Sequence, residues 1–318
     1  MTERDIFDNK DSCFFDNQTD ENLFCFYKKS NHDFKNMFFY ANNTALLSQN
    51  PIVLQEGNYV TEVIVLENEV EKSLQIKNWL NSQGNYHYHT VFRMYRLQKE
   101  QEEDLNYSLI QNPEEHDFEA LLNILEQNFD KYTERIPTLE KLKELQKSIH
   151  LIKVDNEIAA IFLTEIKGTT KNLLFWLVIS KFRGKGYGEL IFKYCLNCDP
   201  EIKRYISWID IRNEYSIKKH IEFGFVKDRI SNSIYLNKNI MNEKIIKILE
   251  DTRPEFDFND EKANFITAGY LDSFDIITLV VDIENTFEVK IIGALIVPES
   301  FYNVASILNL IEVSKNAS

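Results

Sequence analysis

The chain has 318 residues, of which 44% are hydrophobic and 13% aromatic, so it can form two or three domains with packed cores. Its formal net charge of −14 opposes binding to nucleic acid, and its longest apolar runs, residues 173–179 and 291–297, are too short to cross a membrane. The polar start of the chain lacks the apolar stretch of a signal peptide and cysteines are few, so we expect a cytoplasmic protein that binds neither nucleic acid nor membrane.

Negative charge is concentrated near the end of the chain. Residues 241–318 contain 14 Asp and Glu against 6 Lys and Arg, which gives −8, whereas residues 1–240 carry −6. Together with the periodicity described below, this change predicts three parts: a mixed α/β region over residues 1–104, a second domain over 105–240 and a small acidic module over 241–318.

Residues 1–104 are rich in Asn, Phe and Tyr and show only three clear elements. Alternating apolar residues predict a strand at 59–66 and another at 86–95, and helical spacing predicts a helix at 69–80 between them. The pattern indicates mixed α/β structure and no more.

Residues 105–240 show a clearer succession of elements. A strand near residues 106–113 precedes two helices, at 117–132 and 138–147, and Thr138 is placed to cap the second helix. Three strands joined by tight turns follow, and then a helix, a strand, another helix and a hairpin at 225–236. The order β-α-α-β-β-β-α-β-α-β-β predicts a compact mixed α/β domain.

A glycine-rich turn connects the strand that ends at Ser180 to an amphipathic helix. Residues 183–188 read RGKGYG. Glycines let backbone amides approach a phosphate, the start of the helix adds partial positive charge, and Arg183 and Lys185 add full charges. Taken alone, such a turn fits a nucleotide site or a plain tight turn equally well.

A second motif lies downstream, where Asn213 opens a helix that Gly224 and Phe225 close. The two motifs together resemble the GNAT acetyltransferase family over residues 105–240. The resemblance implies a mixed, mostly antiparallel sheet with flanking helices, and acetyl-CoA or another acyl-CoA as cofactor. It also implies that strands 173–180 and 205–212 separate to admit the pantetheine arm, and that Asn213 contacts this arm or the start of its helix. The residues that this resemblance assigns to pyrophosphate binding surround the turn: Val178, Arg183, Gly184, Lys185, Gly186, Tyr187 and Gly188.

Two catalytic positions depart from the family pattern. Seven residues after the Asn, where the family often has a Tyr as general acid for the thiolate, this chain has His220. A histidine can donate a proton near neutral pH, and a substituted helix residue is the alternative. The central strand lacks the family's Glu, so Glu165 on the neighbouring strand is a weak substitute, with a solvated strand-end residue as the alternative. The base stays unassigned.

A carrier motif occupies the acidic module, where Gly269, Leu271 and Asp272 precede Ser273 and Phe274 at the start of an amphipathic helix. It resembles the acyl and peptidyl carrier family, although Phe stands where Leu is commoner. The resemblance implies a four-helix bundle over residues 241–318 and 4'-phosphopantetheine on Ser273, attached by a phosphopantetheinyl transferase. It also implies other biosynthetic enzymes docking on the acidic face. An unmodified Asp-Ser helix cap is the alternative.

Two further patterns suggest metal binding but lack partners. Cys195 and Cys198 form a single CxxC pair, and His87 and His89 share one face of a strand. No third ligand follows at a suitable spacing, so we expect reduced cysteines, packed histidines and no metal.

A GNAT-like domain and a carrier share the phosphopantetheine thioester as substrate. The leading hypothesis is an N-acetyltransferase-like acyltransferase fused to its own carrier, with a linker near residues 237–243, in a specialised-metabolite pathway. It would move an acyl group from acyl-CoA, or from the carrier arm, to an amine or to the carrier thiol. One alternative is a loading domain that decarboxylates malonyl-type units, and another is a non-catalytic GNAT-fold scaffold that presents the carrier to enzymes in trans. Residues 1–104 would form a degenerate second GNAT-like half.

Overall fold

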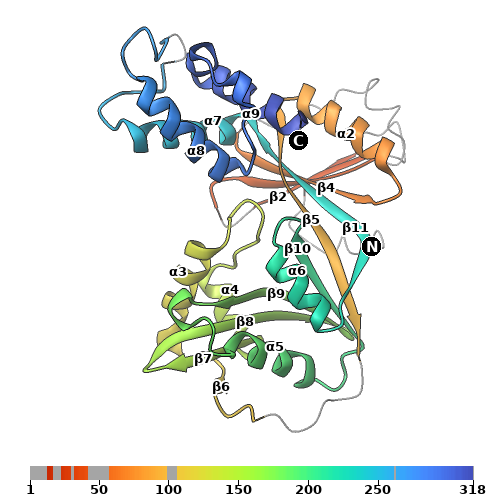
Figure 1. Cartoon of the computed structure of the whole chain (residues 1–318). Coiled ribbons are helices and arrows are strands. Elements are labelled where there is room, and N and C mark those ends of the chain that lie inside the picture. Colours follow the sequence, from red (N-terminus) through yellow and green to blue (C-terminus); the bar gives the residue numbers. More distant parts are fainter. Residues whose placement is uncertain are drawn as a thin grey trace.

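The computed structural model describes residues 13–16, 23–29, 32–41, 57–98, 106–260 and 263–317, in which one sheet carries helices on both faces (Figure 1). The first part of the chain contributes β1 (Cys13–Asp16), β2 (Leu23–Lys29), β3 (Lys35–Ala41), β4 (Tyr59–Leu66), α2 (Val70–Ser82) and β5 (Asn85–Leu97). The second part contributes β6 (Ile110–Gln111), α3 (Phe118–Asn128), α4 (Leu139–Glu144), β7 (Ile149–Val154), β8 (Glu157–Lys167), β9 (Thr170–Val178), α5 (Tyr187–Asn197), β10 (Arg204–Asp210), α6 (Glu214–Glu222) and β11 (Val226–Asn237). The last part contributes α7 (Lys238–Thr252), α8 (Ser273–Phe287) and α9 (Val304–Ala317).

The strands follow the order β1-β2-β3-β4-β11-β5-β10-β9-β8-β7-β6. The pairing is the same in both directions from the centre, where β11 and β5 are antiparallel. On one side, β11 pairs antiparallel with β4, and β4 pairs parallel with β3. On the other side, β5 pairs antiparallel with β10, and β10 pairs parallel with β9. The units β4-α2-β5 and β10-α6-β11 are therefore interleaved, because the last strand of the second unit lies between the two strands of the first.

Most of the expected elements are present, and the mixed, mostly antiparallel sheet with flanking helices is confirmed. Thr138 caps α4, since its side chain accepts a hydrogen bond from the Lys141 amide at 3.2 Å. The expected hairpin at 225–236 is wrong. This segment is the single strand β11, because it pairs with β4 on one side and with β5 on the other. Its register against β5 shifts after Lys227, as in a β-bulge.

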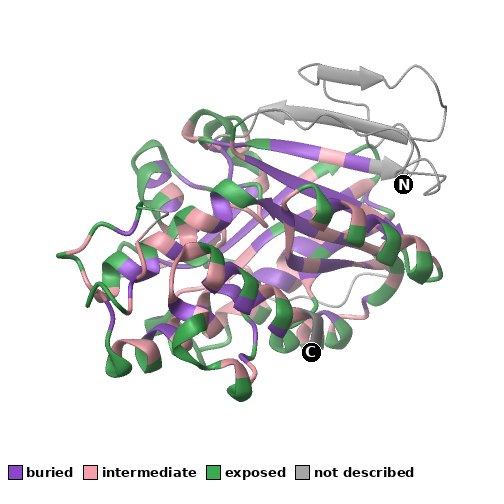
Figure 2. Cartoon of the chain, turned by 90° about the horizontal axis from the view of Figure 1, so that it is seen from above, coloured by how far each residue is buried: buried purple, intermediate pink, exposed green. Residues whose placement is uncertain are grey.

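The two faces of the second half are covered by different helices. Alternating residues of the strands, such as Phe162, pack against Ile191 and Phe192 of α5. Their neighbours, such as Ile161, pack on the opposite face with Leu121 of α3. Figure 2 shows the buried positions concentrated along the strands and the exposed ones on the outer turns of the helices. Burial of each such side chain contributes about 1.5–3 kcal/mol, so this alternation fixes which face each helix covers.

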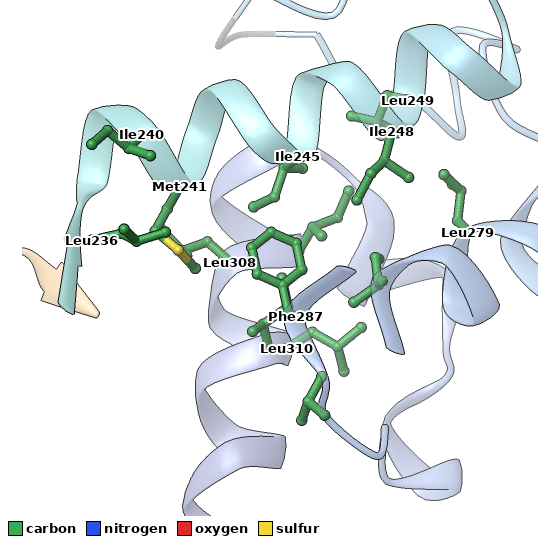
Figure 3. Packing of buried hydrophobic residues seen from close by; sticks show 14 of the residues in the cluster. Leu236, Ile240, Met241, Ile245, Ile248, Leu249, Leu279, Phe287, Leu308 and Leu310 are labelled. Carbon is green, nitrogen blue, oxygen red and sulfur yellow. The ribbon is translucent and has the colours of Figure 1, made fainter. Parts of the chain in front are cut away.

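The C-terminal helices pack directly on the sheet. β11 ends at Asn237 and α7 begins at the next residue, with Asn237 as its cap, so the expected linker near 237–243 is wrong. Met241 and Ile245 of α7 point toward Phe287 of α8 beside Leu236 of β11 (Figure 3), and all belong to one buried core. The C-terminal helices and the sheet therefore share a core.

The described part of the acidic module contains three α-helices, with short 3₁₀ turns at Gly293–Leu295 and Pro298–Phe301. Its described residues between α7 and α8 form turns and extended chain, so a four-helix bundle is not established. Ile277 and Val281 are 64% and 51% exposed, since α8 turns this side away from the core. No described helix of the chain is long and apolar enough to span a membrane.

Candidate active site

The glycine-rich turn forms an open cradle of backbone at the start of α5. Gly184 and Gly186 have φ angles of +77° and +80°, which residues with a side chain rarely adopt, and Gly186 caps the helix. A Cβ atom at either position would meet nothing within 4 Å, so the space in front of the turn is free. The first amides of α5 have no partner within the helix, as at any helix start, and such amides suit an anion such as a pyrophosphate.

Gly188 has a different role, because it lies in the first turn of α5 close to β9. A Cβ atom there would lie 3.0 Å from Cγ2 of Val178 and 3.5 Å from Cζ2 of Trp176. The absence of a side chain at Gly188 thus lets the start of α5 lie against the end of β9. Arg183 is tied to the same strand end, since its Nε donates to the Val178 carbonyl at 3.2 Å.

Strands β9 and β10 pair over only part of their length. The parallel ladder joins Thr170–Leu173 to Arg204–Ser207 and stops there. The remainder of β9, up to Val178, stays paired with β8, and the remainder of β10 stays paired with β5. The strands therefore separate toward the glycine cradle and leave a stretch of the β9 edge with no partner among the described strands.

Asn213 lies at the start of α6, which follows β10. Its Oδ1 atom accepts a hydrogen bond from the Ser216 amide at 3.0 Å, so the side chain serves as the helix cap. Its contact with a pantetheine arm stays a prediction.

His220 is buried on the α5 face of the sheet with 3% of its surface exposed. Its ring lies 5.2 Å from Phe192 and 5.8 Å from Trp176, and Nδ1 lies 2.8 Å from the Ser216 carbonyl, to which it donates. Burial disfavours the charged ring and lowers the pKa of His220 to about 4, although the Ser216 hydrogen bond acts in the opposite direction. At neutral pH the ring is therefore uncharged, with Nε2 as a hydrogen-bond acceptor. A neutral ring is a poorer proton donor than the imidazolium that the sequence motif suggests. The acid role of His220 stays a prediction.

Glu165 lies near the end of β8 that is farther from the cradle. It pairs in register with Asn172, whereas Ala160 pairs with Val178 beside the cradle. Five residues of strand span about 17 Å, and the Glu165 carboxylate contacts Lys167 at 3.3 Å. The structure thus places this weak candidate away from the cradle, and its catalytic role stays a prediction.

The charges of Asp130, Glu134 and Asp210 act on one another, and we call these three residues the acidic group. Asp130 and Glu134 come from the loop between α3 and α4, and Asp210 ends β10. Burial first, and then the charges of Asp130 and Asp210, raise the pKa of Glu134 to about 8. Burial, together with the charge of Asp130, also raises the pKa of Asp210, although a hydrogen bond from the Arg212 amide opposes this shift.

Arg212 occupies the one described cluster that has metal-ligand geometry. His89, Asp210 and Glu288 offer ligand atoms within 4.8 Å of one another. The Arg212 guanidinium contacts all three, with Nε donating to Asp210 at 2.8 Å and further contacts to His89 and Glu288. The position of a cation is thus filled by this side chain, which ties the end of β10 to the residue after α8.

The C-terminal motif places Ser273 in an exposed position as the first residue of α8. Asp272 caps the helix by accepting hydrogen bonds from the amides of Phe274 and Asp275, and Arg253 binds Asp272 at 3.0 Å. Fifteen helical residues span about 22 Å, so Ser273 lies one helix length from the contact between Glu288 and Arg212.

No protein-family model matches this chain, and neither does any curated protein. Solved structures with a similar arrangement include a GCN5-related N-acetyltransferase from Sphaerobacter thermophilus, with 10% identity, a TM-score of 0.47 and coverage of 68% of this chain and 76% of that one. A GNAT-family acetyltransferase from Colwellia psychrerythraea has 12% identity, a TM-score of 0.45 and coverage of 71% and 84%. A tandem GNAT protein from the clavulanic acid biosynthesis pathway has 8% identity, a TM-score of 0.43 and coverage of 68% and 78%.

The glycine-rich turn could be predicted from the sequence, whereas the acidic group could not. Asp130 and Glu134 lie in a loop without periodicity, and Asp210 is distant in the sequence. The only signal in the sequence was a polar loop between two amphipathic helices, which is an ordinary surface pattern.

Proposed function

We propose that this protein is an acyltransferase that takes its acyl group from acyl-CoA. The observation that carries the proposal is the open glycine cradle at the start of α5, which lies where β9 and β10 have ceased to pair. Acyl-CoA supplies an activated thioester. The amides of Gly186 to Gly188 would bind its pyrophosphate, with Arg183 and Lys185 adding positive charge. The free edge of β9 would offer backbone donors and acceptors to the amides of the pantetheine arm.

The same proposal includes a 4'-phosphopantetheine on Ser273. This hydroxyl is exposed at a helix start, where the helix dipole favours a phosphodiester. Because the C-terminal helices share a core with the sheet, Ser273 is held one helix length from the end of β10.

A scaffold remains the second candidate, and one feature of α8 favours it. Phe274, Ile277 and Val281 are 83%, 64% and 51% exposed and lie along one side of the helix beside Ser273. An apolar stripe beside the attachment serine suits docking by enzymes in trans. In that case the shared core would hold the carrier in one orientation, and the cradle would not bind acyl-CoA.

Binding of acetyl-CoA, measured by calorimetry, tests the proposal. Gly186→Glu should abolish binding, because a carboxylate would enter the cradle and repel the pyrophosphate. Gly168→Glu is a matched control, since Gly168 has a φ angle of +60° and free space around it but lies in the turn between β8 and β9. Both variants should lose about 1 kcal/mol of stability. Equal affinity for acetyl-CoA in both variants would contradict the assignment of the cradle.

Intact mass after incubation with CoA and a broad phosphopantetheinyl transferase tests the carrier. The expected adduct should be absent from Ser273→Ala, and an adduct that survives this change would contradict the attachment site. Malonyl-CoA is then added to the loaded protein. Release of carbon dioxide would favour the alternative of a decarboxylating loading domain over simple acyl transfer.

A further inference from the structure

A cavity of about 530 Å³ lies between α7 and the loop that joins α3 to α4. Its walls come from two distant segments, since Lys131 and Tyr132 belong to the loop, whereas Lys244 and Lys247 belong to α7. None of these residues belongs to the glycine cradle. Pockets that bind small molecules have volumes of about 300–1,000 Å³, so this cavity has room for one.

The three lysines of this cavity make no hydrogen bond in the part of the chain that the structure describes. Lys244 approaches a carboxylate only at 3.9 Å, from Asp130, and Lys131 only at 3.6 Å, from Asp33. Lys247 forms no ion pair with any described residue. The Lys244 side chain is only 17% exposed, and polar groups buried to this extent rarely lack a partner. Its ammonium group is therefore suited to a ligand.

The lysines also lie close to one another. The Nζ atoms of Lys131 and Lys244 lie 5.1 Å and 4.9 Å from the centre of the same Tyr132 ring, so these two charges are at most about 10 Å apart. Burial lowers the pKa of Lys244, and the charges of Lys131 and Lys247 lower it further, while Asp130 acts in the opposite direction. An anion bound between the three ammonium groups would relieve this repulsion.

Two of the three carboxylates in the cavity are already engaged. Asp130 accepts hydrogen bonds from the Tyr88 hydroxyl at 2.7 Å and from two backbone amides of its own loop. Glu243 accepts one from the Asn58 side chain at 3.0 Å. Glu126 is exposed, so water can solvate its charge. The hydrogen-bonding capacity left in the walls is therefore mainly that of donors, which suits an anion.

We propose that this cavity binds the phosphate group of a small phosphate monoester through Lys131, Lys244 and Lys247. Such a group carries nearly two negative charges and three acceptor oxygens, which matches three ammonium groups. The rings of Phe129 and Tyr132 line the same cavity and would pack against an apolar part of the ligand. Because α7 supplies two of the three lysines, the bound phosphate would join the C-terminal helices to the loop.

Calorimetry with the full-length protein and phenyl phosphate, in a buffer without phosphate, tests this site. Phenyl phosphate should bind at least about 10-fold more tightly than benzoate, which has a similar ring but a single charge. Lys244→Met should weaken the binding of phenyl phosphate at least about 10-fold, because it removes the most buried charge and keeps the length of the side chain. Lys238→Met is a matched control, since Lys238 is an exposed lysine at the start of the same helix, and it should bind like the wild type.

Thermal unfolding separates loss of the site from loss of the fold. Lys244→Met should melt at a temperature no lower than the wild type, since it removes a largely buried charge that has no hydrogen bond. Phenyl phosphate should raise the Tm of the wild type and of Lys238→Met but not that of Lys244→Met. If Lys244→Met does not fold, Lys247→Met provides the test at an exposed position and should weaken binding about 3-fold.

Each other result counts against the inference. Absence of phenyl phosphate binding, or equal affinity in the wild type and the lysine variants of the cavity, would overturn the site. Equal affinity for benzoate would overturn the assignment to a phosphate.

Acetyl-CoA, which itself carries a phosphate monoester, distinguishes this site from the glycine cradle. Lys244→Met should bind acetyl-CoA as tightly as the wild type, and Gly186→Glu should still bind phenyl phosphate. Loss of acetyl-CoA binding in Lys244→Met would assign the cavity to the phosphate of CoA and overturn a separate site. If the wild type binds phenyl phosphate but not acetyl-CoA, the proposed function fails and the phosphate site stands.

Discussion

Protonation of His220 should destabilise the fold as the pH falls. The ring is 3% exposed among Phe192, Trp176 and Phe225, and no carboxylate in the described part of the chain compensates a positive charge there. Burial therefore lowers the pKa of His220 from 6.5 to about 4. Between these two values the unfolded chain binds a proton that the folded chain does not, so stability is full above 6.5 and is lost as the pH falls toward 4.

The magnitude follows from this difference. Each pH unit within the window corresponds to about 1.4 kcal/mol, so a fall from about pH 8 to about pH 5 should cost roughly 2 kcal/mol through His220 alone. His150 is buried and His87 is partly buried, and loss of solvation lowers their pKa values to about 4 and about 3, so they add losses of the same sign. A comparison of two variants is therefore needed to isolate the contribution of His220.

Urea unfolding of the wild type and of His220→Phe at the two pH values provides that comparison. The phenyl ring fills the same aromatic site without titrating, so the variant should lose about 2 kcal/mol less than the wild type on acidification. Titration of the His220 ring by NMR should independently give a pKa well below 6. Equal pH dependence in both proteins, or a pKa above 6, would refute the reasoning and restore the imidazolium as an acid for the thiolate.

The remaining predictions concern the core and the C-terminal helices. Phe192→Ala should cost about 3–5 kcal/mol in urea unfolding, because this ring is fully buried between α5, α6 and the sheet, and a loss under about 1 kcal/mol would contradict that packing. Burial lowers the pKa of Lys315 to about 7, so the folded chain should release this proton before the unfolded chain and gain stability as the pH rises above 7. Lys315→Met should remove this gain, measured as the difference in Tm between about pH 7 and about pH 9, and an unchanged difference would show that Lys315 is solvated.

The sequence by itself determined the features that depend on a few neighbouring residues. The ranges of β4 and α2, the helix caps at Thr138 and Asp272, and the glycine turn could all be predicted from it. These features follow from residue periodicity, from hydrogen bonds to amides two or three positions away, and from the backbone freedom of glycine. Such interactions are local, so they form independently of how distant segments of the chain pack.

Only the tertiary structure decided the features that depend on distant segments. β11 is one strand and not a hairpin because β4 and β5 supply hydrogen-bonding partners along both of its edges. The pKa values of Glu134 and His220 are set by burial against segments that are far away in the sequence. Desolvation and strand pairing depend on which distant surfaces come into contact. The spacing of residues within a short segment of sequence does not indicate this.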